Sequence, residues 1–165
     1  MSRDQPALFD AGVFTAALLR GDPRHAEARH LVEEARLGHV NACTTVGILS
    51  EVFAALTWEK AQPRHAPAEA AGPNRTLLEA PSAIRVLAEG QGAALLFLDI
   101  TAAHGLTARR VHDARHVATA LAAGVKQAYT YDTAHWRRFE ENGVSIVGPA
   151  GSSAPKRSER APPEP

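Results

Sequence analysis

The sequence predicts an α/β domain, built as a three-layer α/β/α sandwich around about five parallel strands. The prediction depends on alternation: short apolar segments with strand-forming residues are followed by longer segments whose apolar residues recur at helical spacing. Such alternation is typical of a parallel sheet covered by helices on both faces. The 165 residues suffice for one domain with a sizeable core, which we place at residues 1–149. Residues 150–165 have almost no apolar side chains and are predicted to form a disordered tail.

The composition limits the functional classes that are open to this chain. Lys plus Arg and Asp plus Glu both number 18, so no net charge attracts nucleic acid or membrane, and a polyanion would need a local basic patch. The single cysteine, Cys43, excludes an internal disulfide and fits a reducing compartment. The N-terminus lacks the long apolar region of a signal peptide, and the longest apolar run, Ala93–Leu98, is too short to span a bilayer. We therefore expect a soluble, cytoplasmic protein that does not bind membranes.

The first elements are a strand and two helices. Pro6–Phe9 is expected to be a short strand that ends on Asp10, and a helix closed by Gly21 follows it. Asp22-Pro23 predicts the start of the second helix, with Asp as N-cap and Pro at the first helical position. Gly38 ends that helix.

The next strand, His39–Cys43, leads into a third helix that Thr44 or Thr45 caps. Its inner face is apolar and consists of Ile48, Leu49, Val52, Phe53 and Leu56. Glu51 interrupts this face. Because an unpaired carboxylate is costly to bury, we expect Glu51 either to reach solvent or to meet a cation.

The middle of the chain has weaker signals. Gln62–Asn74 is interpreted as a loop or short helical turn, and Leu77–Glu89 as helix. Ala94–Leu98 is predicted to be the third strand, and Thr101–Ala108 a helix. Asp99, which follows the predicted strand, is interpreted as the cap of that helix, with a fifth acid at the sheet edge as the alternative.

The last third begins with an amphipathic helix at Val111. Its apolar face consists of Ala114, Val117, Ala118, Leu121, Ala122 and Val125. Gly124 ends the helix, and Gln127–Thr130 is the next strand. Ala134–Asn142 is a short helix, and Val144–Val147 is the last strand.

Acidic residues occur where the ends of these elements should meet. Asp10 and Asp132 follow the carboxyl ends of two strands, Asp113 lies in the first turn of its helix, and Glu51 lies in the third helix. In open α/β sheets ligands bind at that edge. Two plainer interpretations stay open: Asp113 would only complement the helix dipole, and Asp132 would only cap the next turn.

A cluster of these acids would have a definite chemistry. Four like charges stay ionised side by side only around a cation. Oxygen ligands suit Mg²⁺ or Mn²⁺ rather than zinc. Ions of this kind activate water and neutralise a scissile phosphate, so the sequence predicts metal-assisted phosphodiester hydrolysis.

Five segments, in this order and spacing, resemble PIN-domain ribonucleases and, within that group, the VapC toxins of bacterial toxin–antitoxin pairs. The segments are LFDAGVF, GDPRHAEARHLV, TTVGILSEVFAAL, GLTARRVHDARHVATALAAGV and TYDTAHWRRF. The resemblance spans roughly Ala7 to Pro149 and implies a PIN-like fold and an endoribonuclease. It also implies a homodimer, RNA as substrate and an antitoxin protein that covers the acidic cleft.

The resemblance assigns the acidic site position by position. Asp10, Glu51, Asp113 and Asp132 would be the catalytic residues and the ligands of Mg²⁺ or Mn²⁺. Two departures stand out. Many family members follow the first Asp with a hydroxyl residue and an Asn, where this chain has Ala11 and Gly12, and His135-Trp136 stands where many have Asp-Phe.

Basic residues near the acidic motifs are candidates for contacts with the RNA backbone. The candidates are Arg109, Arg110, His116 and Arg137. The alternative for the arginines is a solvating role, and for His116 a structural hydrogen bond. The HDARH segment resembles the HExxH zinc motif only superficially, because no third ligand is evident.

A non-catalytic module of the same fold, binding RNA or an antitoxin, is the alternative to a nuclease. The complete set of four acids argues against it. A flavodoxin-like phosphoacceptor domain would need a lysine after the last strand, and only Lys156 in the tail follows.

Overall fold

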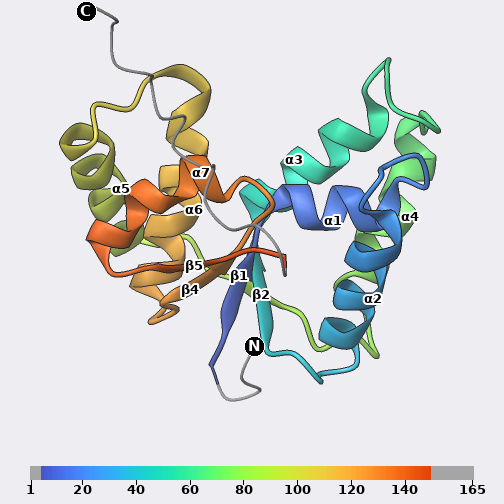
Figure 1. The fold of residues 1–165 in the computed structure, drawn as a ribbon, viewed down its shortest axis with the longest axis horizontal. Coiled ribbons are helices and arrows are strands. Elements are labelled where there is room, and N and C mark those ends of the chain that lie inside the picture. Colours follow the sequence, from blue (N-terminus) through green and yellow to red (C-terminus); the bar gives the residue numbers. More distant parts are fainter. Residues whose placement is uncertain (1–4, 150–165) are drawn as a thin grey trace, which may run out of the picture.

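The computed structural model describes residues 5–149 and shows an open, fully parallel sheet with helices on both sides (Figure 1). The five strands are β1 (Ala7–Phe9), β2 (Ala42–Thr45), β3 (Arg85–Leu87), β4 (Gln127–Tyr129) and β5 (Ser145–Val147). Their order in the sheet is β3-β2-β1-β4-β5. The predicted fold class, an α/β sandwich with five parallel strands, is confirmed.

Within residues 5–149, seven helices cover the sheet, and Figure 1 shows the first four on one side and the last three on the other. They are α1 (Ala11–Leu18), α2 (His25–Arg36), α3 (Val46–Thr57), α4 (Pro67–Thr76), α5 (Gln91–Ala103), α6 (Val111–Ala122) and α7 (Thr133–Trp136). Two short 3-10 helices, η1 (Ala108–Arg110) and η2 (Arg137–Asn142), follow α5 and α7. None of the helices described combines the length and the apolar character that crossing a bilayer requires.

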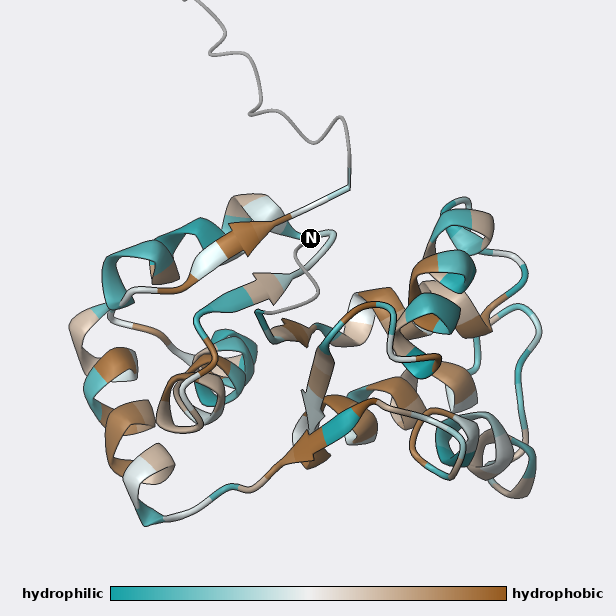
Figure 2. Cartoon of the chain, turned by 90° about the horizontal axis from the view of Figure 1, so that it is seen from below, coloured by the Kyte–Doolittle hydropathy of each residue, from teal (hydrophilic) through white to brown (hydrophobic). Residues whose placement is uncertain are grey.

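The core lies on both faces of the central strand. All three residues of β1 are fully buried, and the ring of Phe9 contacts the rings of Phe14 and Tyr129. Trp136 and Phe139 are buried with their rings edge to face. Helix α5 is hydrophobic along most of its length (Figure 2).

The middle of the chain differs from the prediction. Ala94–Leu98, predicted as a strand, lies within α5, while the third strand is Arg85–Leu87, inside a segment predicted as helix. A short apolar run fits a buried strand and a helix equally well, so its periodicity decides nothing. Strand β3 lies at the sheet edge with two of its three residues exposed, which removes the apolar signal of a strand. Asp99 is therefore an exposed residue within α5 and neither caps a helix nor follows a strand.

Several helices also begin or end at other residues than the sequence predicted. The segment interpreted as a loop contains α4, and helix α5 ends at Ala103. Helix α2 begins at His25, because Asp22 closes a turn instead of capping the helix: its Oδ1 accepts the backbone N–H of Arg24 at 2.8 Å. Thr45 is confirmed as the cap of α3, with its Oγ1 accepting the N–H of Ile48 at 3.1 Å. The predicted tail at 150–165 lies outside the described residues.

Candidate active site

The strand order places two acid-bearing strand ends side by side. From β1 the chain builds the sheet outward through β2 and β3, and then returns to add β4 on the other side of β1. Phe9 and Tyr129, the last residues of β1 and β4, are paired in register. Asp10 and Thr130 follow directly. Ligands of open α/β sheets bind at this kind of switch point, at the carboxyl ends of the strands.

Asp10 is held in place by two hydrogen bonds. It is the N-cap of α1, where its Oδ1 accepts the backbone N–H of Ala11 at 2.7 Å. Its Oδ2 accepts the hydroxyl of Thr130 at 2.8 Å. Burial raises the pKa of Asp10 above its ordinary value, and these two hydrogen bonds offset only part of the effect.

Thr130 connects two of the acids, a role that sequence reasoning did not assign. Its side chain is fully buried; it donates to Asp10 and accepts the backbone N–H of Asp132 at 3.0 Å. One hydroxyl therefore fixes the acid after β1 relative to the loop after β4. The available signal was the Thr-x-Asp pattern at 130–132.

Glu51 lies in the second turn of α3, where it is hydrogen-bonded to a histidine and stays partly exposed to solvent. Its Oε1 is 2.8 Å from Nε2 of His116, although the Glu51 side chain keeps 37% of its exposure. Burial alone would raise the pKa of Glu51, but the hydrogen bond from His116 and the electrostatic effects of His116, His112 and Arg115 together outweigh it, and the net pKa is lowered.

His116 has a structural role in place of the predicted RNA contact. Its side chain is fully buried, and its second nitrogen, Nδ1, lies 2.9 Å from Oγ1 of Thr45. Both ring nitrogens are therefore bonded inside the protein, and none is left for RNA. The burial of His116 and the exposure of His112 also remove the basis for a zinc motif at HDARH.

Asp113, in the first turn of α6, is influenced electrostatically by the other three acids. Burial raises its pKa to about 6, and the Asp10 carboxylate is the next largest cause. Glu51 and Asp132 raise it as well, while His116 lowers it. A carboxylate that only complemented the helix dipole would have a lowered pKa. The interpretation of Asp113 as a dipole partner alone therefore does not account for its surroundings.

Asp132 is the most exposed of the four acids. It caps α7, as the plainer interpretation held, with its Oδ1 3.4 Å from the backbone N–H of His135. Nδ1 of His135 lies 2.7 and 2.8 Å from the two carboxylate oxygens. His135, one of the departures from the family pattern, therefore binds an acid of the site.

The donor set fits a divalent cation by its chemistry. Four carboxylates supply only oxygen ligands. The pKa of Asp113 is raised first by burial and then by the neighbouring carboxylates, and a bound cation would stabilise its charged form against both. Within residues 5–149, no three acidic, histidine or cysteine side chains lie close enough together to form a ready-made metal site. The carboxylates of the described residues therefore interact electrostatically but do not lie close enough together to coordinate one ion.

Basic side chains border the acids. A small hollow of about 10 Å³ beside Asp113 is lined by Arg110, His135 and Arg138. Arg109 and Arg137 are exposed nearby in sequence, in η1 and η2. Three of the predicted RNA-contacting residues, Arg109, Arg110 and Arg137, are therefore solvent-accessible on the elements that flank the acids.

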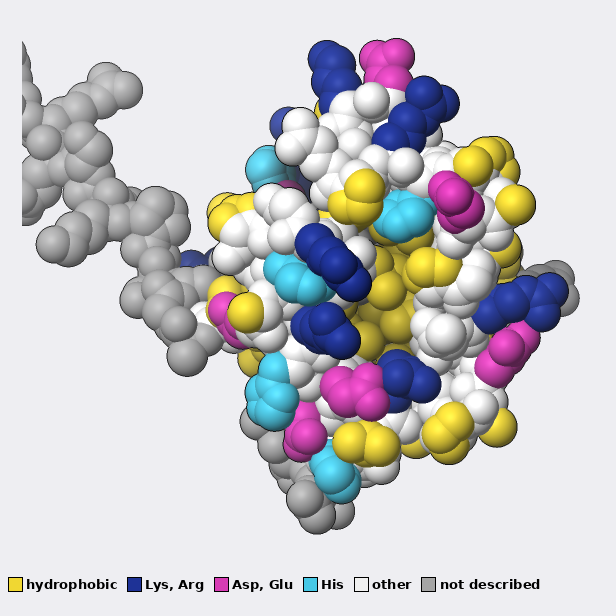
Figure 3. All heavy atoms as spheres, turned by 90° about the vertical axis from the view of Figure 1, so that its right-hand side faces the viewer, with side chains coloured by type: hydrophobic (Ala, Val, Ile, Leu, Met, Phe, Trp, Pro, Cys, Tyr) yellow, Lys and Arg dark blue, Asp and Glu magenta, His cyan; other side chains and the backbone are white. Residues whose placement is uncertain are grey.

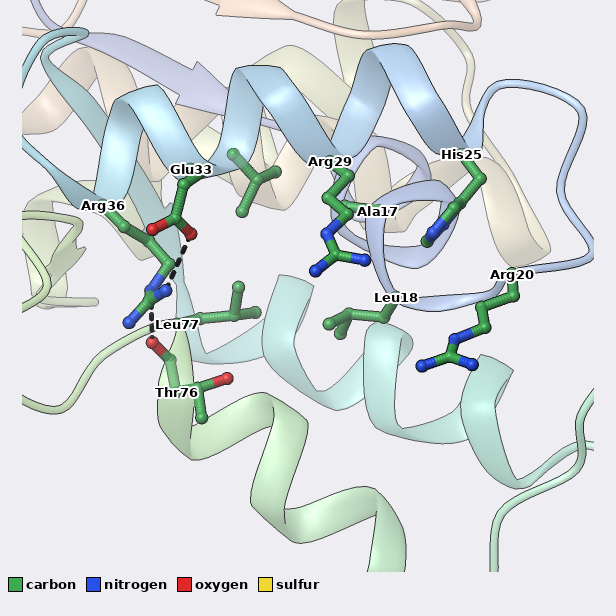
Figure 4. Close-up of a pocket in the computed structure, with 10 residues that line it drawn as sticks. Ala17, Leu18, Arg20, His25, Arg29, Glu33, Arg36, Thr76 and Leu77 are labelled. Atoms are coloured by element: carbon green, nitrogen blue, oxygen red, sulfur yellow. Dashed lines mark hydrogen bonds and ion pairs between the residues drawn. The ribbon is translucent and has the colours of Figure 1, made fainter.

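A separate hollow of about 270 Å³ lies between α1, α2 and α4, and sequence reasoning did not find it. We call it the α2–α4 hollow. Its apolar floor is ringed by basic side chains (Figure 3). Arg20 and Arg29 extend over it beside Leu18, whereas Arg36 is held by Glu33 and the carbonyl of Thr76 (Figure 4).

The open, parallel sheet with Asp10 and Asp132 near the carboxyl ends of β1 and β4 defines an α/β domain of the class that binds ligands at this edge, and the sequence comparison gives the family. The chain belongs to the PIN domain family, whose model matches residues 7–142. No curated protein sequence matches it.

Two solved structures have a similar fold. The first is VapC20 of Mycobacterium tuberculosis, a toxin that cleaves the sarcin–ricin loop, with 19% identity and a TM-score of 0.62 over 86% of this chain and 98% of that one. The second is VapBC2 of Rickettsia felis, bound to a DNA fragment from its promoter. It shares 9% identity, with a TM-score of 0.58 over 87% of this chain and 98% of that one.

Proposed function

We propose that the protein is a metal-dependent endoribonuclease that hydrolyses RNA phosphodiester bonds and acts as the toxin of a toxin–antitoxin pair. The observation that carries the proposal is the electrostatic coupling of four acids distant in sequence: Asp10, Glu51 and Asp132 all raise the pKa of Asp113. Membership of the PIN domain family and the fold shared with VapC20 support it.

Each acid has a separate part in this proposal. Asp10, Asp113 and Asp132 would be direct ligands of Mg²⁺ or Mn²⁺, and Glu51 either a ligand or the residue that orients a reacting water. The bound ion would neutralise the scissile phosphate and make water a better nucleophile. Thr130 and the Ala11 N–H keep Asp10 oriented. Binding of the metal ion would therefore cost this side chain little further conformational entropy.

The arginines would bind the substrate. Arg109, Arg110 and Arg137 carry charges on the elements that flank the acids, where they would contact phosphates next to the scissile bond. Because the chain has no net charge, this local patch would supply the attraction for RNA.

The partner proposed from VapBC2 is an antitoxin protein. The α2–α4 hollow has an apolar floor, and arginines outnumber acidic residues in its lining. It therefore suits a segment that combines apolar and acidic side chains. A homodimer and a cytoplasmic location complete the proposal.

A second candidate is a catalytically inactive module that binds RNA or an antitoxin. The pairing of Asp132 with His135 favours it, because a histidine that engages both carboxylate oxygens competes with a metal for the same ligand.

RNA cleavage by the purified protein tests the proposal, with Mg²⁺, Mn²⁺ or EDTA as the three conditions. We expect internal cleavage with either metal and none with EDTA. Cleavage that is indifferent to EDTA would overturn the metal dependence, and no cleavage with either metal would overturn the nuclease in favour of the binding module.

A further inference from the structure

The His116 ring sits between α3 and α6 and is bonded at both ends. Because an ionised carboxylate only accepts hydrogen bonds, Nε2 of His116 must be the donor to Glu51. On the other side, Nδ1 lies 2.9 Å from the Thr45 hydroxyl, which also accepts the N–H of Ile48. Thr45, His116 and Glu51 therefore form one hydrogen-bonded chain that begins at the cap of α3.

The backbone of α3 is shaped to admit this ring. A Cβ on Gly47 would lie 2.7 Å from Cε1 of His116 and would also overlap the guanidinium of Arg115. Glycine weakens a helix interior, so its place in the first turn of α3 has a cost that the close approach of α6 explains.

A histidine is an unusual choice for this position. Most of the other buried residues of α6 are apolar, namely Ala114, Val117, Ala118 and Ala120, and Thr119 is polar. An apolar residue at 116 would avoid the cost of burying two polar ring nitrogens. The histidine supplies what an apolar residue lacks, a fixed donor to Glu51.

Glu51 needs such a donor to keep one orientation. Its side chain is long and remains 37% exposed, so without a partner it would sample several rotamers. The bond from a fully buried ring points its carboxylate toward the side of α6 that carries Asp113, three residues before His116.

We propose that His116 is a positioning residue: anchored by Thr45 and admitted by Gly47, it holds the Glu51 carboxylate in place among the acids of the site. It acts through Glu51 and touches neither RNA nor metal. The inference rests on the proposed function, because it assigns Glu51 a part in binding the divalent ion.

Two substitutions separate this role from simple packing. His116→Gln places an amide nitrogen near the position of Nε2 and keeps the donor to Glu51, whereas His116→Asn is shorter and reaches only the position of Nδ1. Both leave a polar amide in the same buried place. We measure Mn²⁺ affinity by isothermal titration calorimetry, the kcat and KM of RNA cleavage, and thermal unfolding by circular dichroism.

His116→Asn is expected to weaken Mn²⁺ binding by about 10–100-fold, the usual effect of losing a residue that orients a metal ligand. It should lower kcat more than it changes KM. His116→Gln should restore most of the Mn²⁺ affinity. In a Glu51→Gln background, His116→Asn should have no further effect on Mn²⁺ affinity, because its only route to the ion is gone.

The outcomes distinguish this inference from the proposed function. If wild type binds Mn²⁺ and both His116 variants bind it equally well or equally poorly, the inference is wrong and the nuclease proposal stands. Wild type that neither binds Mn²⁺ nor cleaves RNA overturns both. Should His116→Asn fail to fold, Thr45→Val and Thr45→Ser decide: only Val, which removes the anchoring hydroxyl, is expected to weaken Mn²⁺ binding, and equal effects would contradict the inference.

Discussion

Two carboxylates of the candidate site are paired with histidines, and the two pairs differ in their burial and in the elements that they connect. Glu51 is bonded to His116, whose ring is fully buried and anchored at its other nitrogen. Asp132 is bonded to His135, and both of these side chains are more than half exposed. The first pair links α3 to α6, and the second lies within a single turn.

The difference indicates which part of the candidate site is preformed. We call the Glu51–His116 pair and Asp10 the preformed half. Surface pairs contribute little and exchange readily with water, whereas a buried bond with fixed partners holds one geometry. Asp10 belongs to the preformed half through Thr130. Asp113 is influenced by charges from both pairs. Among the causes of its raised pKa within the described residues there is no hydrogen bond, only burial and surrounding charges.

The largest effect is expected at this central acid. Asp113→Asn removes one charge at nearly constant shape. Removing a residue that only orients a metal ligand usually lowers metal affinity or activity by ~10–100-fold, and removing a direct ligand should lower activity by more. We therefore expect RNA cleavage with Mg²⁺ to fall by at least about 100-fold in kcat/KM. Asp99→Asn, on the exposed side of α5, is the matched control and should cleave as wild type does. Cleavage retained by Asp113→Asn would remove this residue from the site.

The second effect is a pH dependence of stability without metal. The pKa of Asp113 rises from 3.8 to about 6 on folding, so the folded state holds this proton more tightly than the unfolded state. The resulting stabilisation is present below about pH 4 and is lost as the pH rises through 6. Asp113→Asn lacks this loss. Its free energy of unfolding relative to wild type should therefore increase between pH 4 and pH 7, by at most about 3 kcal/mol.

Urea denaturation of both proteins at several pH values, with EDTA present, measures this difference. Comparing the two proteins cancels the titration of the other carboxylates. A difference that stays constant from pH 4 to pH 7 would contradict the account of Asp113.

The third expected effect is a loss of stability at the glycine beside the buried histidine of the preformed half. Gly47→Ala should destabilise the protein by about 1–3 kcal/mol, because the added methyl group overpacks against the buried ring of His116. Gly12→Ala is the control beside Asp10: its Cβ would meet Asp10 Oδ2 at 3.6 Å, an ordinary contact. Thermal unfolding should show a loss for Gly47→Ala alone, and a Gly47→Ala protein as stable as wild type would show that α3 does not need this glycine.

The smallest effect is expected at the exposed pair. His135→Ala should change the free energy of unfolding by less than about 1 kcal/mol, as is usual for exposed ion pairs. Mn²⁺ affinity, measured by calorimetry, should stay within about 5-fold of wild type, the equivalent of that energy. A larger loss of affinity would place His135 in the site, and a large gain would show that it competes with the metal for Asp132.

Sequence reasoning predicted the parts of the fold whose signals are local. Strand β1 and helix α3 have apolar faces and recognisable ends, and the acids follow from their places at those ends. Edge strand β3 and helix α5 were misassigned because exposure, not propensity, distinguishes them. Arg85 and Val86 are exposed on β3, and α5 is apolar around much of its circumference.

The contacts that organise the site were harder to predict, because they join distant residues. Glu51 and His116 are 65 positions apart, and their hydrogen bond exists only because α6 crosses α3 at Gly47. Thr130 and Asp10 are 120 positions apart and meet through the pairing of β1 with β4. The four acids were predicted as a set, while the residues that hold them were not.

The pKa of the Asp113 side chain, measured by NMR with and without Mg²⁺, tests the central claim most directly. Without metal we expect a pKa of about 6, raised by burial and by the neighbouring carboxylates. With saturating Mg²⁺ we expect it to fall well below that value, because a bound cation favours the charged form. A pKa near 6 that Mg²⁺ leaves unchanged would contradict a divalent ion among these acids.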